Sequence, residues 1–273
     1  MKRPFAQVDV FGDGGISGNP LAVVLDGSGL DDAELQSFAS WTNLSETTFL
    51  FPPDDAAADY RVRIFTGSAE LPFAGHPTLG SAHAWLAAGG RPRTPGRLVQ
   101  ECGAGLVQLH LDDDRLAFAA PVRLRTGPLD PATVQLAEAV LGIPSNEWVA
   151  HEWGDNGPPW MMIQLADAAA VRAASIDHSR LGPTQHLGLI GLSEGPSAYE
   201  VRGFVGNWED PVTGSLNAAA AQWLRARSLV PPTYMATQGS RLGRRGEIFV
   251  HDDGTAIWIG GRVRTVVSGT ADL

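Results

Sequence analysis

Short segments in which apolar and polar residues alternate, or in which apolar residues run together, recur along the whole chain. Glycine- and proline-rich turns separate them. Both patterns are typical of β-strands, so the chain predicts many short strands. The predicted strands are residues 5–11, 21–25, 47–51, 60–65, 98–101, 106–111, 116–119, 148–151, 160–165, a strand from residue 199, 247–251, 255–259 and 262–267.

Helix patterns interrupt these strands at intervals. They predict helices at residues 33–41, with Asp31 or Asp32 as cap, from His76-Pro77 to about residue 88, at 132–141 and at 215–227. Helices scattered among many short strands favour an α+β fold over a doubly wound parallel sheet. Phosphate-binding Gly-x-Gly-x-x-Gly and Walker sequences are missing from the chain.

One segment of the pattern occurs twice. Residues 60–75, YRVRIFTGSAELPFAG, align without a gap with residues 199–214, YEVRGFVGNWEDPVTG. Eight of the sixteen positions are identical, where average composition would give about one. The identical pairs are Tyr60/Tyr199, Val62/Val201, Arg63/Arg202, Phe65/Phe204, Gly67/Gly206, Glu70/Glu209, Pro72/Pro211 and Gly75/Gly214. Each copy predicts a strand, a turn and the start of a helix, so the chain carries a duplicated unit.

The distance between the copies indicates two domains of similar size, because it is far longer than any solenoid repeat. The proline-rich segment 121–131 is the predicted linker. We expect one domain over residues 1–121 and a second over 122–261. The last strand, within residues 262–273, either completes the second domain or returns to the first.

The composition of the chain excludes several classes of function. The formal net charge of −10 argues against nucleic acid as the main partner, since phosphate binding needs a basic face. Cys102 is the single cysteine, which excludes an intrachain disulfide and, with no secretory segment, indicates a cytoplasmic protein. No apolar stretch is long enough to span a bilayer.

The two repeated turns are the strongest lead to a site. We name residues 70–77 the first corner and residues 209–216 the second corner. A helix N-terminus binds carboxylate or phosphate, and Gly75 and Gly214 allow a ligand to approach the backbone closely. His76 and Ser215 occupy matching positions from which a side chain can donate to that ligand. The alternative is that both are ordinary helix caps.

Four acidic residues near the predicted turns differ in the roles that the sequence suggests for them. Asp210 stands where the first copy has Leu71, so it either forms the turn or projects into a site to hold an amine or a proton. Glu70 and Glu209 are shared by both copies, which suggests structural roles. Glu46, in a polar patch between a predicted helix and strand, suits proton transfer if it is partly buried.

Two other chemistries do not fit. Asp210, Ser215 and His76 include the side chains of a hydrolase triad, but Ser215 lacks the Gly-x-Ser-x-Gly elbow. The seven histidines lack metal-ligand spacing, so we expect no metal site.

The motifs together resemble the phenazine-biosynthesis PhzF-like isomerase family. The matching segments are residues 8–25, VDVFGDGGISGNPLAVVL, the NLSETTF segment at 43–49, FAGHPTLG at 73–80, EDPVTGS at 209–215 and the glycines near the end of the chain. The resemblance covers essentially the whole length. The family often continues Gly-Ser-Ala-His where this chain has Gly214-Ser215-Leu216-Asn217, so the founding substrate of the family does not carry over directly.

This resemblance implies a diaminopimelate-epimerase-like fold: two similar domains, each an antiparallel β-barrel around a central helix, with the active site in the cleft between them. It implies a homodimer and an isomerase that works without a cofactor on a small carboxylate-bearing substrate, such as a dihydro-hydroxyanthranilate. The implied roles are acid/base for Glu46, substrate binding and proton movement for His76, Asp210 and Ser215, and substrate binding for Gly75, Gly214 and Asn19.

Two alternatives stay open: a small-molecule-binding or regulatory protein on the same scaffold, and an epimerase or racemase that does not use paired thiols. A two-thiol racemase is excluded, because Cys102 belongs to neither corner.

Overall fold

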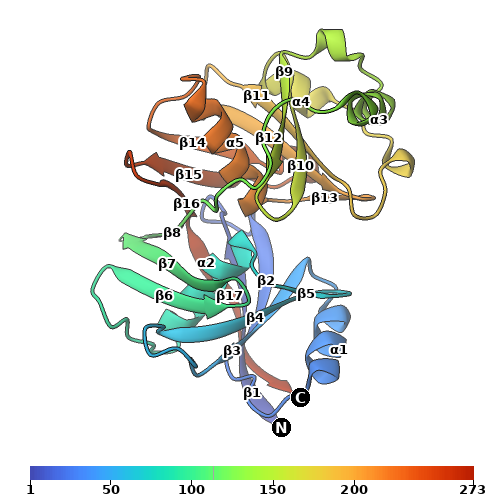
Figure 1. Ribbon diagram of the computed structural model, residues 1–273. Helices are drawn as coiled ribbons and strands as arrows, with labels where there is room; N and C mark the ends of the chain where they lie inside the picture. Colours follow the sequence, from blue (N-terminus) through green and yellow to red (C-terminus); the bar gives the residue numbers. More distant parts are fainter. Residues whose placement is uncertain (113) are drawn as a thin grey trace. The chain divides into compact units, whose positions relative to one another are not determined.

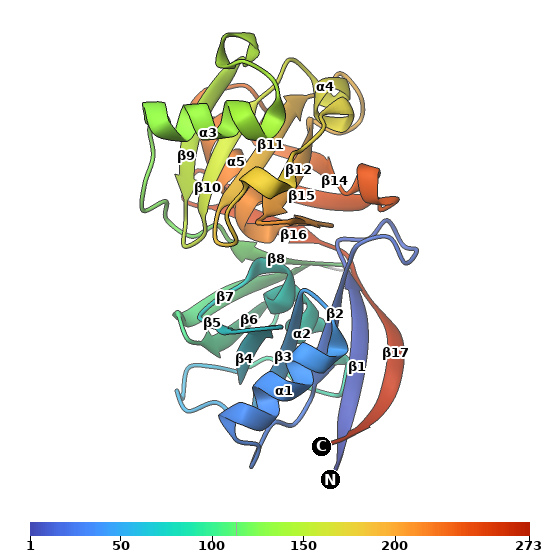
Figure 2. The ribbon, with the colours of Figure 1, turned by 90° about the vertical axis from the view of Figure 1, so that its right-hand side faces the viewer.

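The computed structural model describes residues 1–112 and 114–273, and the chain divides into two units. Unit 1 comprises residues 1–119 and 260–273, and unit 2 comprises residues 120–259. The last strand, β17 (Val263–Asp272), pairs antiparallel with the first, β1 (Lys2–Val10), so the end of the chain completes unit 1. Figure 2 shows these two strands side by side.

Unit 1 surrounds one buried helix with strands (Figure 1). Its further elements are β2 (Asn19–Val24), α1 (Asp32–Thr42), β3 (Glu46–Phe51), β4 (Tyr60–Thr66), β5 (Glu70–Leu71), α2 (Gly75–Ala87), β6 (Arg97–Cys102), β7 (Gly105–Asp112) and β8 (Arg115–Ala119). Helix α2 contacts β1, β2, β3, β6, β8 and β17. It comes so close to β2 that a Cβ atom on Gly80 would lie 2.5 Å from the Leu21 side chain, which only glycine avoids.

Unit 2 repeats this arrangement. Its elements are α3 (Pro131–Leu141), β9 (Ala150–Asp155), β10 (Pro159–Gln164), α4 (Ala168–Ala173), β11 (His186–Leu192), β12 (Tyr199–Val205), β13 (Trp208–Asp210), α5 (Gly214–Ala226), β14 (Thr233–Gln238), β15 (Gly246–Asp252) and β16 (Ile257–Gly261), with short 3-10 turns at Ser145–Glu147, His178–Arg180 and Ser240–Leu242. Unit 2 ends at Ile259 within β16, and the last two residues of this strand belong to unit 1.

The strand pairings match between the units. In unit 1, β2–β3 and β4–β6 are parallel, while β1–β2, β3–β4 and β6–β7 are antiparallel. In unit 2, β10–β11 and β12–β14 are parallel, while β9–β10, β11–β12 and β14–β15 are antiparallel. The predicted α+β class is confirmed. Most pairings of the expected antiparallel barrels are antiparallel, and each unit also contains the two parallel pairs named above.

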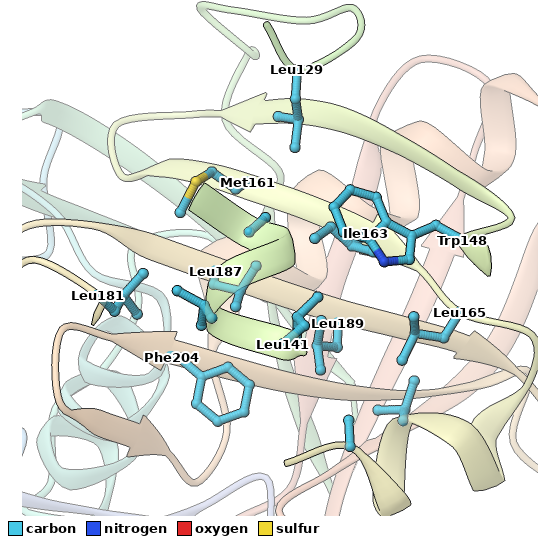
Figure 3. Packing of buried hydrophobic residues seen from close by; sticks show 14 of the residues in the cluster. Leu129, Leu141, Trp148, Met161, Ile163, Leu165, Leu181, Leu187, Leu189 and Phe204 are labelled. Atoms are coloured by element: carbon cyan, nitrogen blue, oxygen red, sulfur yellow. The ribbon is translucent and has the colours of Figure 1, made fainter. Parts of the chain in front are cut away.

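Unit 2 is held together by a continuous apolar cluster between its strands and the helices α3 and α4 (Figure 3). Ile163, Leu187 and Leu189 on β10 and β11 are fully buried in it. Truncating one such side chain to alanine costs about 2–5 kcal/mol of stability, since the lost contacts leave a cavity.

Helix starts follow local capping chemistry. Asp31 caps α1: it accepts from the Glu34 N–H, and the Glu34 carboxylate accepts from the Asp31 N–H. Asp130 caps α3 by accepting from the Thr133 N–H and is followed by Pro131 at the first helical position. Both helices begin within one residue of the position that the sequence predicts.

Candidate active site

The duplicated segment forms the same structure twice. In unit 1 the guanidinium of Arg63 on β4 donates two hydrogen bonds to Glu70 on β5, at 2.8 and 2.6 Å. In unit 2 Arg202 on β12 donates two to Glu209 on β13, both at 2.8 Å. Each arginine also lies over a phenylalanine ring two residues further along its strand, 5.0 Å from the centroid. These contacts fit the structural role predicted for the two glutamates.

Both repeated helices begin without a side-chain cap. Helix α2 begins at Gly75, and its N-cap residue, Ala74, has no group that could accept a hydrogen bond. Helix α5 begins at Gly214 after Thr213, which also makes no capping hydrogen bond. The first backbone N–H groups of both helices therefore lack the usual side-chain acceptor.

The ordinary capping interpretation of the two matching residues is wrong. Both helices start one residue earlier than predicted, at a glycine, so His76 and Ser215 are the second helical residues and not caps. A side chain at that position lies beside the helix N-terminus and can add a donor to it.

At the first corner, three predicted residues come together. His76 Nε2 lies 3.4 Å from Glu46 Oε2, and His76 Nδ1 lies 3.4 Å from Asn19 Nδ2. Glu46 can contact His76 of α2 because it is the first residue of β3, directly after the turn that follows α1. Its side chain is 16% exposed, whereas the His76 side chain is only 5% exposed. A partly accessible carboxylate therefore adjoins a buried imidazole.

Burial controls the charge of this imidazole. It lowers the pKa of His76 to about 3, and a hydrogen bond with the Pro20 backbone acts weakly in the opposite direction. The ring is neutral at physiological pH, so the contact with Glu46 is a contact with a neutral group. A neutral imidazole can donate or accept a hydrogen bond. It does not form an ion pair that would hold the Glu46 carboxylate in its charged form.

At the second corner, a buried network holds the turn. The Thr213 hydroxyl donates to Asp210 Oδ2 at 2.7 Å, which explains why it does not cap α5. Gln238, 1% exposed, donates to the Asp210 carbonyl and to Thr213 Oγ1, and it accepts from the Thr213 N–H. Asn217 Nδ2 donates to the Thr213 carbonyl and to Gln238 Oε1. The Asp210 side chain contributes to this turn and is 9% exposed.

Ser215 has two partners of its own. The Trp160 indole N–H donates to Ser215 Oγ at 3.1 Å, and Asn156 Nδ2 donates to the Ser215 carbonyl at 2.9 Å. No sequence motif singles out Trp160 or Asn156, because both come from the β9–β10 hairpin and reach Ser215 only through the fold. Gln238 directly precedes one of the glycines near the end of the chain that match the family, but the sequence there does not reveal its partners.

Cys102 lies at the end of β6, outside both corners. It is buried, its thiol is 3.5 Å from the Gly105 carbonyl, and burial raises its pKa. A buried thiol with a raised pKa is a poor base. Among the described residues, no group of three His, Cys, Asp or Glu side chains is placed to hold a metal ion.

A hollow of about 530 Å³ in unit 1 lies beside the C-terminal half of α2, lined there by His83 and Leu86. None of the predicted site residues lines it. Its arginines have protein partners: Arg262 Nε donates to Asp114 at 2.8 Å, and Arg264 donates to the Gly14 carbonyl at 3.0 Å.

Similarity to known proteins agrees with the fold. A protein of the phenazine biosynthesis PhzF family from Enterococcus faecalis has the same fold, with a TM-score of 0.82, 24% identity and full coverage of both chains. A hydroxyproline epimerase from Agrobacterium vitis shares it more distantly, with a TM-score of 0.59 and 13% identity over 100% of this chain and 93% of that one. The fold is therefore PhzF-like and related to that of proline-racemase-like epimerases.

Sequence similarity identifies the family. Residues 8–271 match the family model described as phenazine biosynthesis-like protein. Antisense-enhancing sequence 1 of Schizosaccharomyces pombe is 34% identical over 98% of each chain, and trans-2,3-dihydro-3-hydroxyanthranilate isomerase of Pseudomonas aeruginosa is 31% identical over 98% of this chain and 99% of its own. The chain belongs to the phenazine biosynthesis-like PhzF family and is an isomerase of that family. The resemblance seen in the sequence is confirmed.

No helix in the described part of the chain has the length and apolar character needed to cross a membrane.

Proposed function

We propose that the protein isomerises a small carboxylate-bearing substrate by moving a proton, without a cofactor, and that Glu46 is the acid/base. The observation that carries this proposal is the 3.4 Å contact between Glu46 and the buried, neutral His76. A carboxylate beside a neutral imidazole can take up a proton from carbon and return it, because no imidazolium stabilises one charge state.

The remaining predicted residues are proposed to bind the substrate. Uncapped helix N-termini at Gly75 and Gly214 attract a negative charge, and Ser215 adds a hydroxyl at the second of them. Asp210 is proposed to hold an amine or a proton, and Asn19 to bind the substrate beside His76. A carboxylate-bearing dihydroaromatic amino acid fits this set of groups. Relatives named as dihydro-hydroxyanthranilate isomerases support that substrate class.

Hydrogen–deuterium exchange tests the role of Glu46. The protein is incubated with trans-2,3-dihydro-3-hydroxyanthranilate in deuterated water, and product formation and label uptake are followed by NMR. We expect Glu46→Gln to slow turnover by about 100-fold or more, since a positioned acid/base contributes about 10²–10⁴-fold. Glu194→Gln, in an exposed loop, serves as the matched control.

Turnover by Glu46→Gln at the wild-type rate would contradict the proposal. Product formation by the wild type without label would not, because a shielded carboxylate can return the same proton. The homodimer and the cytoplasmic location implied by the sequence stay predictions.

A further inference from the structure

The hydroxyl of Ser215 is bound from one side by a tryptophan. Trp160 Nε1 lies 3.1 Å from Ser215 Oγ. An indole N–H can only donate, so the serine oxygen accepts in this hydrogen bond. The direction of the bond follows from the chemistry of the two groups and needs no observation of the hydrogen atom.

The proton of the Ser215 hydroxyl is left for another acceptor. Serine in a helix commonly donates to the carbonyl three or four residues earlier, which here would be Val212 or Pro211. Among the hydrogen bonds of residues 1–112 and 114–273, Ser215 Oγ makes only the bond from Trp160. Gly214 and Leu216 on either side are buried, but Ser215 is half-buried and accessible to a ligand.

Trp160 is held in place from both sides. It lies in β10 opposite Gly154 of β9 and His186 of β11, and it is 1% exposed. The edge of its ring system meets the His186 ring at 80°, with 5.0 Å between centroids. A large side chain packed between two neighbouring strands cannot turn away without opening the core.

The backbone at Ser215 is fixed as well. Asn156, on the turn between β9 and β10, donates to the Ser215 carbonyl at 2.9 Å. The β9–β10 hairpin therefore holds Ser215 by its side chain and by its main chain. It does so at a helix N-terminus where Thr213 donates to Asp210 and makes no cap.

We propose that Trp160 is a positioning residue that fixes Ser215 as a hydrogen-bond donor, so that the substrate group bound there is an anionic acceptor. This inference rests on the proposed function and deepens it. The Ser215 hydroxyl and the first N–H groups of α5 are then hydrogen-bond donors to the same substrate group. A carboxylate is stabilised by these donors, whereas an ammonium group in the same place would meet only donors from Ser215 and the first turn of α5.

A double-mutant cycle tests this assignment in the full chain, with 3-hydroxyanthranilate as the probe and isothermal titration calorimetry as the measurement. We expect Ser215→Ala to weaken binding by about 10- to 150-fold, because a hydrogen bond to a charged group contributes about 1.5–3 kcal/mol and 1.4 kcal/mol is tenfold. Trp160→Phe leaves the hydroxyl in place but unpositioned and should weaken binding by about 5- to 30-fold. In the Ser215→Ala background, Trp160→Phe should change the Kd by less than about 2-fold.

Trp153→Phe is the matched control. Trp153 lies on the adjacent strand β9, it is 8% exposed, and its indole nitrogen has no hydrogen-bond partner within the described structure. Its substitution removes an N–H group and retains an aromatic ring, as in Trp160→Phe, and should leave the Kd unchanged. A loss equal to that of Trp160→Phe would show a general effect of packing and overturn the assignment.

Three further outcomes would overturn it: no effect of Trp160→Phe, an equal effect with and without Ser215, or no saturable binding by the wild type. If Trp160→Phe does not fold, the NMR signals of the tryptophan indole N–H protons test the hydrogen bond instead. Ser215→Ala should shift one tryptophan Nε1–H signal upfield, and eight unchanged signals would contradict the hydrogen bond. Turnover by Glu46→Gln at the wild-type rate, together with intact coupling between Trp160 and Ser215, would overturn only the role of Glu46.

Discussion

His76 is a titratable side chain kept out of water at a helix N-terminus. Its side chain is 5% exposed, and burial lowers its pKa to about 3. In the unfolded chain its pKa returns to about 6.5. Between these two values the unfolded state binds a proton that the folded state does not, so stability falls as the pH falls from about 6.5 towards 3.

Replacing His76 should remove this part of the acid sensitivity. Between pH 7 and pH 5, the wild type should lose about 2 kcal/mol more of its free energy of unfolding than His76→Gln does. Urea denaturation at several pH values measures the difference. The comparison uses the slope against pH, so a constant loss of stability in the variant does not affect it.

His251→Gln controls for the removal of a histidine, since His251 is exposed on β15. The control should keep the pH dependence of the wild type. Parallel pH profiles for the wild type and His76→Gln would show that His76 takes up its proton over the same pH range in the folded protein as in the unfolded chain, and Glu46 would then face a cation at acid pH.

Only those site residues that lie in the repeated segment or directly after it could be predicted from the sequence pattern. His76 and Ser215 are visible because they occupy matching positions after a shared glycine. Glu46 lies outside the repeat, and the sequence pattern alone does not distinguish it from an exposed loop glutamate. Trp160 could not be predicted, because its role depends on a contact with a residue 55 positions away along the chain.

At the scale of the elements, the two copies of the strand–turn–helix segment share geometry and differ in burial. The Arg202 and Glu209 side chains are 6% and 11% exposed, and those of Arg63 and Glu70 are 25% and 41% exposed. Arg202 also donates to the carbonyls of Val171 and Ala174. The same ion pair is therefore part of the interior in unit 2 and of the surface in unit 1.

Because of this difference in burial, replacing the arginine by methionine should lower the free energy of unfolding by different amounts at the two matching positions. Arg202→Met should cost about 3–5 kcal/mol of unfolding free energy, because it leaves Glu209 charged and buried without its partner. Arg63→Met should cost about 1 kcal/mol or less, because water can replace the arginine. Urea denaturation of both variants measures the two costs, and equal losses would contradict the argument.

The four long helices and most strands can be predicted from the residue patterns, but the direction of strand pairing cannot. Strands β2 and β3 are parallel because α1 crosses between them, and the sequence shows the helix without showing the crossover. The short helix α4 has only six residues, too few to give a recognisable helical period.

At the scale of the whole chain, unit 1 is built from both ends and unit 2 from the middle. The repeat predicts two units of similar size, but residues 262–273 carry no signal that decides which unit they join. The structure gives them a long antiparallel pairing with β1 that reaches from Lys2 to Val10. This pairing covers an edge of β1 that would otherwise be open to other chains.

The two ends of the chain are close enough to be joined. The Met1 ammonium lies 3.1 Å from the Asp272 carboxylate, and the Leu273 N–H donates to the Met1 carbonyl at 3.1 Å. We predict that a circular permutant with a short Gly-Ser linker between the old ends, and new ends between Gly195 and Pro196, folds with a free energy of unfolding within about 1 kcal/mol of the wild type. The new ends fall in an exposed turn between β11 and β12, where few backbone hydrogen bonds are lost.

A second permutant with new ends between Val201 and Arg202 is the control. That cut interrupts β12, whose residues pair with both β11 and β14, and it should abolish cooperative folding. Urea denaturation and deuterium exchange on the substrate compare the three proteins. If the Gly195 permutant fails while its linker is long enough to span the ends, the connection through residues 193–198 is needed for folding itself. If both permutants fold equally well, the continuity of β12 contributes little to unit 2, although it carries Arg202 and leads to the second corner.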